Sequence, residues 1–296
     1  MSRLAAVASR CFQIISLSEK GNLRKDLSKA NTRLRIAASS YLNTAPLIWS
    51  FLHGSKRESA KLLTDESPAR CAEMLARDEV QAALVPVIEY QRIPGIALVP
   101  DVCVASRFAV RSVIIASKGD ELKSLRRIAL DDSSRTSAAL VKIIFREFLG
   151  FEPEWRVMCS DVAAMLEDND AALIIGDPAM RISDDQFHVF DLATLWREHT
   201  GLGFVFAMWM AREEEAEQIR AIDFIAARNE GLAHVEEIVS EYEPRLGLTH
   251  SALGSYLTQN ISFSLDKELR AGLELFFELA RKHKLIPERR DLKMLY

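Results

Sequence analysis

The chain has 296 residues, of which 49% are hydrophobic and 27% are charged, as is typical of a globular protein with one large domain or two ordinary ones. Its net charge of -4 and isoelectric point near 5.9 argue against a general nucleic-acid binder, which would carry a basic face. The sequence has no run of about 18 apolar residues, so we expect no helix that crosses a membrane.

The residues that usually build metal or disulfide sites are scattered. Cys11, Cys71, Cys103 and Cys159 form no C-x-x-C pair, which is typical of thiols in a reducing compartment. The six histidines show no metal-ligand spacing, so we expect no metal. There is also no G-x-G-x-x-G, P-loop or G-x-S-x-G motif, which removes support for dinucleotide, nucleoside-triphosphate and acyl-transfer chemistry.

The first 32 residues differ from the rest of the chain. They are basic and contain several serines, and their apolar stretch is broken by Arg10, Gln13 and Ser16. This segment lacks the clean apolar core of a secretory signal, and two acidic residues weaken the pattern of an organelle-targeting helix. We therefore expect residues 1–32 to be a poorly ordered leader outside the functional fold.

The chain then begins a regular β–α alternation. We predict strands over residues 34–38, 60–66 and 82–90. A polar turn follows the first strand, and Pro46 lies in the first turn of the helix that comes next. Pro68 begins the helix between the second and third strands, with Ser67 as its cap.

The alternation continues to residue 212. A β-rich stretch covers residues 96–117, and a strand, a polar turn and an amphipathic helix follow over residues 126–149. Further strands are expected at residues 154–159, 171–175 and 204–212. The remainder of the chain is predicted to be helical.

This order of elements predicts an α/β protein with two lobes. Lobe one would hold residues 33–117 plus 205–296, with the helical tail, and lobe two would hold residues 118–204. Ligands in open α/β folds bind where the carboxyl ends of the strands meet, so we expect a ligand cleft between the lobes.

The segment Leu130–Leu140, LDDSSRTSAAL, is the strongest candidate for a binding turn. A strand that enters a helix through hydroxyl residues presents free N–H groups and a positive helix end, which suit a carboxylate or phosphate. An ordinary helix cap remains the alternative, because Ser, Thr and Asp are the residues that helix starts prefer. Arg135 could add a positive charge or simply face solvent.

Other strand ends carry small polar residues as well. Asn43 and Asp177 could act in a site or cap helices, and Ser112 could be a tolerated strand residue. Asp131 and Asp132 are adjacent and would diverge on a strand, which does not favour a two-carboxylate site. The residues that we expect to bind a substrate are Ser40, Thr44, Ser134, Thr136, Ser137, Gly176, Asp177, Thr200 and Gly201.

Several motifs, in this order, resemble the chorismate dehydratase (MqnA) family of the futalosine route to menaquinone. They are SYLNTAPL (40–47), RSV (111–113), ALDDSSRTSAAL (129–140), LIIGDPAM (173–180), DLATLW (191–196), TGLGFVFAMW (200–209) and YLTQNISFSLD (256–266). The resemblance covers residues 34–290 and implies a two-lobed periplasmic-binding-protein-like fold of type II that works in the cytoplasm.

The resemblance also implies a reaction: chorismate loses water to give 3-[(1-carboxyvinyl)oxy]benzoate, without a cofactor or metal. It assigns catalytic roles to Asn43 and Ser112, which would position the substrate and hydrogen-bond the transition state. No His or Glu stands in a motif position, so we hypothesise that a carboxylate of chorismate takes the proton. Chorismate would be the small-molecule partner, and neither nucleic acid nor membrane is expected; the oligomeric state stays open.

Two features depart from the family pattern. Gly203 stands where the family usually has proline, and Arg107 and Phe108 precede RSV where a glycine is usual. These two residues could narrow the cleft or add a charge to it. Two alternatives also stay open. One is a non-catalytic solute-binding protein for a small aromatic carboxylate, and the other is the sister enzyme that makes 1,4-dihydroxy-6-naphthoate.

Overall fold

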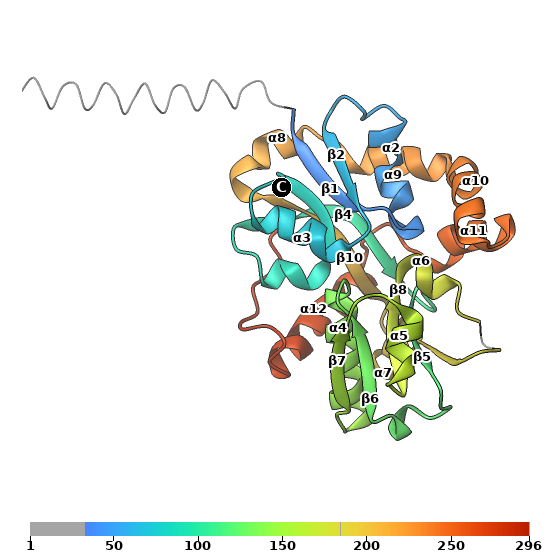
Figure 1. Ribbon diagram of the computed structural model, residues 1–296. Coiled ribbons are helices and arrows are strands. Elements are labelled where there is room, and N and C mark those ends of the chain that lie inside the picture. The colour runs from blue at the N-terminus through green and yellow to red at the C-terminus, as the bar shows by residue number, and fades with distance from the viewer. Residues whose placement is uncertain (1–32, 184, 296) are drawn as a thin grey trace, which may run out of the picture. The chain divides into compact units, whose positions relative to one another are not determined.

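The computed structural model describes residues 33–183 and 185–295. The leader predicted over residues 1–32 lies outside the described residues. From Arg35 onward the chain forms one compact unit, which is built around two five-stranded sheets (Figure 1). The α/β class expected from the order of elements is confirmed.

The sheet of lobe one has the strand order β2-β1-β3-β10-β4. Its strands are β1 (Arg35–Ser39), β2 (Lys61–Asp65), β3 (Ala82–Pro86), β4 (Ile96–Ser106) and β10 (Phe204–Arg212). The first three run parallel, and β10 pairs antiparallel with both β3 and β4. Every residue of β3 is buried, as expected for a central strand covered on both faces. The strand predicted over residues 82–90 ends at Pro86 and continues as the 3-10 turn η2 (Val87–Gln91).

Helices from both ends of the chain cover this sheet. Those near the start are η1 (Leu42–Thr44), α2 (Ala45–Leu52) and α3 (Pro68–Ala76). The tail supplies η5 (Glu213–Glu215), α8 (Ala216–Arg220), α9 (Phe224–Ala233), α10 (Val235–Leu246), α11 (His250–Ser255), η6 (Tyr256–Asn260) and α12 (Lys267–Lys282). The tail is therefore helical up to Lys282, as predicted, but residues 283–295 form no helix, and Met294 makes an isolated β-bridge with Leu98. Helix α9 packs on α2, where Gly231 is needed because a Cβ there would lie 1.9 Å from the carbonyl oxygen of Pro46.

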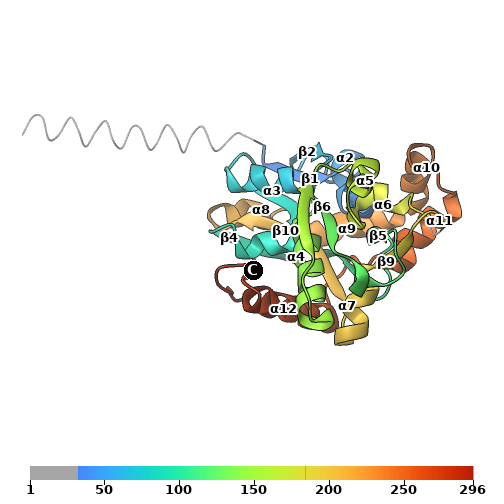
Figure 2. The same cartoon turned by 60° about the horizontal axis from the view of Figure 1, so that its bottom comes forward.

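The sheet of lobe two has the order β7-β6-β8-β5-β9. Its strands are β5 (Val113–Ser117), β6 (Arg127–Asp131), β7 (Glu154–Met158), β8 (Ala171–Ile175) and β9 (His188–Asp191). Its helices are η3 (Leu122–Ser124), α4 (Arg135–Ile143) with its continuation η4 (Ile144–Leu149), α5 (Val162–Glu167), α6 (Gly176–Met180) and α7 (Leu192–Thr200). Helix α4 contacts α7 of the same lobe and also α12 of the tail (Figure 2).

One predicted boundary needs correction. We expected residues 33–117 in lobe one, yet β5 pairs antiparallel with β8 and β9 and so belongs to lobe two. The chain crosses between the lobes over residues 107–112, before β5, and returns over residues 201–203, before β10. The run 96–117 is rich in Val, Ile and Ala on both sides of the crossover, and the polar residues between 106 and 112 can also occur within a strand, so the sequence did not reveal where the chain leaves one sheet for the other. In the described part of the chain, no helix is long and apolar enough to cross a membrane.

Candidate active site

Residues of both lobes line a cavity of about 60 Å3. The apolar part of its wall includes Leu84, Val104 and Phe206, and polar groups are contributed by Asn43 and by the turn that begins at Ser133. Such a lining suits a small molecule with an apolar body and oxygen-rich ends.

The turn after β1 presents Asn43 to this cavity. The neighbouring Thr44 also lines it, but its hydroxyl donates to the carbonyl oxygens of Ser39 (2.6 Å) and Tyr41 (2.8 Å), so its proton is already used. Ser40 lies in an adjoining groove, where its hydroxyl is 3.4 Å from the carbonyl oxygen of Asp65. Of the three residues predicted here, Asn43 therefore has the side chain best placed to meet a ligand.

The turn between β6 and α4, together with the first turn of α4, supplies the hydroxyls that we predicted to bind a substrate from lobe two. Ser134, Thr136 and Ser137 are buried and line the cavity. The hydroxyl of Ser134 has no hydrogen-bond partner, and although Ser134 precedes α4, its side chain does not cap that helix. Thr136 accepts the backbone N–H of Ile88 at 3.2 Å, which leaves its own proton free to donate. These contacts favour a ligand site over an ordinary helix cap.

Arg135 does not simply face solvent. Its guanidinium pairs with Glu89 (3.0 Å) and Glu73 (2.8 Å), both from lobe one. Glu89 is almost fully buried and also pairs with Arg92. Arg135 therefore connects the two lobes beside the cavity. Only the tertiary fold brings Glu73 and Glu89 close to it.

Ser112 lies at the end of the first crossover, directly before β5. It is fully buried, and its Oγ accepts a hydrogen bond of 2.7 Å from the hydroxyl of Tyr256. The backbone on its amino-terminal side is held by Asp191, whose carboxylate accepts the N–H groups of Val110 (3.1 Å) and Arg111 (2.6 Å). The same carboxylate caps α7 through the N–H groups of two further residues. Arg111 has a φ of 62°, so this anchor holds a backbone conformation that non-glycine residues seldom adopt.

Tyr256 lies at the two residues to which the family resemblance assigns catalysis. Its hydroxyl donates a hydrogen bond to Ser112, and the side chain of Asn43 lies near the same hydroxyl. The ring is 1% exposed, and burial raises the pKa of Tyr256 far above its usual range, so the phenol stays protonated near neutral pH. Sequence reasoning missed this residue, because a single tyrosine in a helical tail is typical of core packing.

Gly176 and Asp177 lie where β8 ends, against the turn of lobe one that carries Asn43. Gly176 has a φ of +66°, and a Cβ there would lie 2.6 Å from the ring of Tyr41. Asp177 accepts the backbone N–H of Leu42 at 2.9 Å. It therefore caps a turn of the other lobe rather than binding within the cavity that we describe. Burial raises the pKa of Asp177 to about 6, although the bond from Leu42 partly opposes this rise.

Thr200 and Gly201 do not belong to this site. They end α7, where the hydroxyl of Thr200 donates to the carbonyl oxygen of Trp196 at 2.7 Å and Gly201 adopts a φ of +72°. Helix α7 begins beside the crossover at Asp191, but its nine residues carry the chain about 13 Å away. Sequence order alone does not reveal this displacement.

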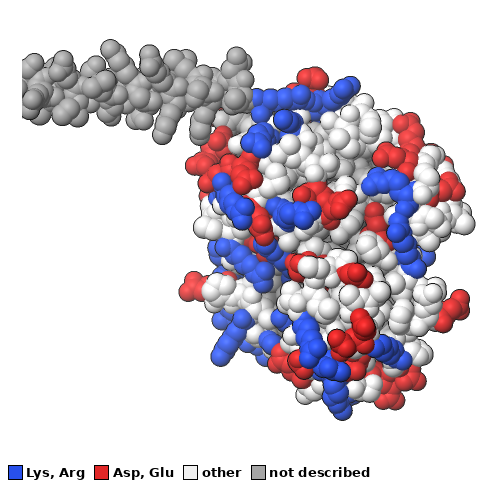
Figure 3. Space-filling view, viewed as in Figure 1, with Lys and Arg blue, Asp and Glu red and all other residues white. Residues whose placement is uncertain are grey.

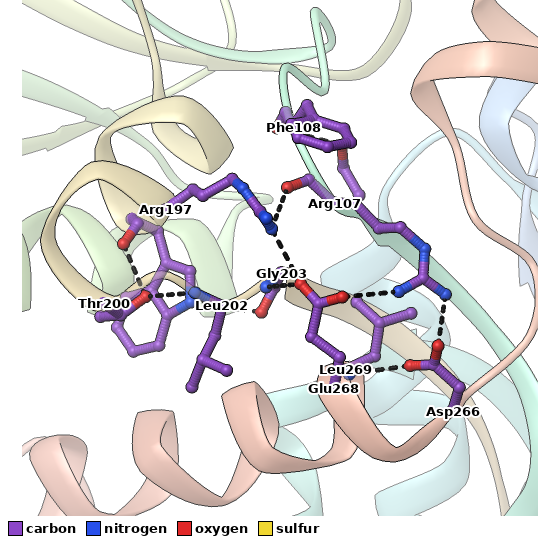
Figure 4. A network of polar contacts seen from close by, with 11 residues as sticks. Arg107, Phe108, Arg197, Thr200, Leu202, Gly203, Asp266, Glu268 and Leu269 are labelled. Carbon is purple, nitrogen blue, oxygen red and sulfur yellow. Dashed lines mark hydrogen bonds and ion pairs between the residues drawn. The ribbon is translucent and has the colours of Figure 1, made fainter.

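The residues that depart from the family pattern form a network of their own (Figure 4). Arg107 pairs with Asp266 (2.7 Å) and Glu268 (3.1 Å) at the start of α12, and Glu268 also accepts the N–H of Gly203 at 3.2 Å. Phe108 is 63% exposed and lies under the guanidinium of Arg197. Neither Arg107 nor Phe108 is among the residues that line the cavity described above, and their effect on the cleft stays a prediction. Arg107 holds the first crossover against the start of α12.

Known proteins support the fold and identify the family. A chorismate dehydratase from Thermus thermophilus is 31% identical over 257 residues, which cover 80% of this chain and 92% of that protein. The fold is similar to a crystal structure from Archaeoglobus fulgidus, with a TM-score of 0.70, 18% identity, and coverage of 86% of this chain and 98% of that one. It is also similar to the periplasmic aliphatic sulphonate binding protein of Escherichia coli, with a TM-score of 0.63, 19% identity, and coverage of 88% and 95%.

The two structural relatives confirm the two-lobed, periplasmic-binding-protein-like fold and extend no further, because their identity to this chain is low. The sequence match is more specific. The family described as menaquinone biosynthesis matches residues 34–282, which include both lobes and every residue that lines the cavity. The protein therefore belongs to the menaquinone biosynthesis family.

Proposed function

We propose that the protein is a chorismate dehydratase, a carbon–oxygen lyase that converts chorismate into 3-[(1-carboxyvinyl)oxy]benzoate and water. The observation that carries the proposal is the meeting of Asn43 and Ser112 at the hydroxyl of Tyr256, beside a cavity lined by both lobes. The relative named chorismate dehydratase, which aligns over most of the chain, supports the same reaction.

The polar groups of the cavity suit a dicarboxylate. The unpartnered hydroxyl of Ser134 and the free proton of Thr136 lie at the N-terminal turn of α4, where the helix end adds positive potential. We assign them to one carboxylate of chorismate. Asn43 and Ser112 then act at the ring, where they orient the hydroxyl that leaves.

The elimination balances without any further reactant. The C3–H bond breaks, its electrons form a double bond in the ring, and the C4–O bond breaks as the hydroxyl takes a proton and leaves as water. Among the described residues that line the cavity, the ionisable ones are Tyr41 and Arg135. Burial raises the pKa of Tyr41 to about 12, and Arg135 is a cation, so neither is a general base near neutral pH. We therefore propose that a carboxylate of chorismate accepts the C3 proton.

A cytoplasmic location belongs to the same proposal, because an enzyme of menaquinone biosynthesis acts on small intermediates made inside the cell. Acidic and basic side chains are interspersed on the face seen in Figure 3, without the continuous basic stripe that nucleic acids require. This pattern is compatible with a small-molecule substrate.

The test is to incubate the purified full-length chain with chorismate and to follow the product by mass. Loss of one water from chorismate, at a rate proportional to protein concentration, is the expected result. Binding of chorismate without turnover would instead indicate a solute-binding protein. If chorismate is neither bound nor converted, the sister reaction that forms 1,4-dihydroxy-6-naphthoate is the next candidate.

A further inference from the structure

We propose that Tyr256 is a positioning residue that fixes the hydrogen-bonding direction of Ser112 for the dehydration. The inference rests on the proposed function and adds a residue to it. Two segments that are far apart in sequence meet at the Tyr256 hydroxyl: the crossover before β5 and the π-helical turn η6 of the tail. Neither Tyr256 nor Ser112 is among the residues that line the cavity, but Ser112 directly precedes Val113, which does, so Tyr256 acts through Ser112.

The hydrogen bond between the two hydroxyls gives this contact its consequence. The Tyr256 hydroxyl donates to Oγ of Ser112 at 2.7 Å. A serine hydroxyl has one proton, and here that proton is not needed for the bond to Tyr256. The Ser112 proton can therefore be donated to the substrate.

Tyr256 is itself held in a way that fixes this geometry. The same turn η6 carries Asn260, whose Nδ2 donates to the carbonyl oxygen of Ala109 at 2.8 Å. The turn η6 therefore bonds to the backbone of the crossover through Asn260 and to the side chain of Ser112 through Tyr256. Single π-helical turns such as this one occur frequently at functional sites.

The variant Tyr256→Phe tests the proposal, because it keeps the buried ring and removes only the hydroxyl. The matched control is Tyr90→Phe. Tyr90 is 2% exposed, and its hydroxyl donates to the carbonyl oxygen of Asp291 (2.6 Å) and accepts the N–H of Lys293 (2.8 Å), with no contact to Asn43 or Ser112. The control thus loses a buried, hydrogen-bonded hydroxyl and keeps its aromatic ring, as Tyr256→Phe does. Circular dichroism and melting temperature verify that both variants fold, and assays are run well below the lower melting temperature.

We expect Tyr256→Phe to lower kcat for chorismate about 10-fold or more while KM changes much less, since the bond acts on the reacting geometry. Tyr90→Phe should retain the wild-type kcat even if its stability falls more. In the background of Ser112→Ala, removing the Tyr256 hydroxyl should have little further effect, because a residue that acts through Ser112 is not additive with it.

Three outcomes would overturn the proposal. The first is a wild-type kcat in Tyr256→Phe, and the second is a loss of kcat equal to that of Tyr90→Phe. The third is a full multiplicative loss when Tyr256→Phe is added to Ser112→Ala, which would make Tyr256 an independent contributor. A wild-type protein that does not dehydrate chorismate would refute the proposed function itself, and so differs from all three.

Discussion

Gly176 and Asp177 are neighbours in sequence that act differently at the contact between the lobes. Gly176 is required by its backbone conformation and by the ring of Tyr41, which leaves no space for a side chain. Asp177 reaches across to the N–H of Leu42 and so holds the turn that carries Asn43. At this scale the chemistry of the site depends on contacts that each residue makes outside its own lobe.

The close approach at Gly176 predicts a specific cost for adding one methyl group. Gly150 also has a positive φ, of +77°, but no atom lies within 4 Å of the place that a Cβ would take there, so Gly150→Ala should cost about 1–2 kcal/mol from backbone strain alone. Gly176→Ala adds a clash with Tyr41 and should cost at least about 1 kcal/mol more. Urea unfolding of both variants measures the difference, and equal losses would contradict this interpretation of Gly176.

Asp177 predicts a pH dependence of stability. Its pKa rises from an ordinary 3.8 to about 6 on folding, so the folded state binds the proton more tightly than the unfolded state. The stability that Asp177 contributes is thus fully present below pH 3.8 and is lost as the pH rises through about 6. Asp177→Asn keeps an oxygen for the N–H of Leu42 and removes the charge. It should therefore raise the melting temperature above that of wild type at pH 8, and the gain should vanish near pH 4; a gain that is constant with pH would contradict this assignment.

At the scale of elements, the crossover before β5 depends on side chains from two other parts of the chain. Asp191 holds the N–H groups of Val110 and Arg111 while capping α7, and Asn260 of η6 holds the carbonyl oxygen of Ala109. The crossover therefore delivers Ser112 to one position although it contains no regular secondary structure of its own.

Removal of the Asp191 carboxylate should affect two elements at once. Asp191→Ala loses a helix cap, worth about 1 kcal/mol, and leaves two N–H groups of the crossover without their partner, at about 1–3 kcal/mol more. The control is Asp223→Ala, because Asp223 caps α9 through the N–H of Ala226 and holds nothing else by its side chain among the described hydrogen bonds. We expect chemical denaturation to show the larger loss for Asp191→Ala, which should also lower kcat/KM. Equal effects of the two variants would contradict a special role of Asp191.

At the scale of the whole described unit, four polar contacts hold the lobes against each other around the cavity. They are the ion pairs of Arg135 with Glu73 and with Glu89, the bond from Ile88 to Thr136, and the bond from Leu42 to Asp177. In each of them one lobe supplies a side chain for a group of the other. We therefore expect single side chains to shift the balance between closed and open arrangements of the lobes.

Arg135 offers the clearest test of this equilibrium. Arg135→Gln removes both of its ion pairs with lobe one, which should lower the fraction of molecules in the closed arrangement and raise the apparent KM about 3–10-fold. The radius of gyration from small-angle scattering should increase at the same time. The matched control is Arg70→Gln, because Arg70 pairs with Asp65 within lobe one. An increase in KM without any change in scattering would point to a direct substrate contact instead of lobe closure.

Local pattern predicted much of this structure, because strands, helices and their caps depend on residues close in sequence. The polar strand ends at Asn43, Ser134 and Thr136 were recognisable, because each follows the carboxyl end of a strand in a parallel pair of its own lobe. The cavity lies where these ends of the two sheets face each other. The family was identifiable too, since its motifs are short and contiguous.

The sequence by itself thus determined the two β–α blocks, the helical tail and most of the polar lining of the cavity. Only the tertiary structure decided that β5 joins lobe two, that Thr200 and Gly201 lie away from the site, and that Tyr256 bonds to Ser112. The physical reason is separation along the chain. Tyr256 and Ser112 are 144 residues apart, and the partner of a side chain at that distance depends on how whole sheets and helices pack rather than on any local pattern.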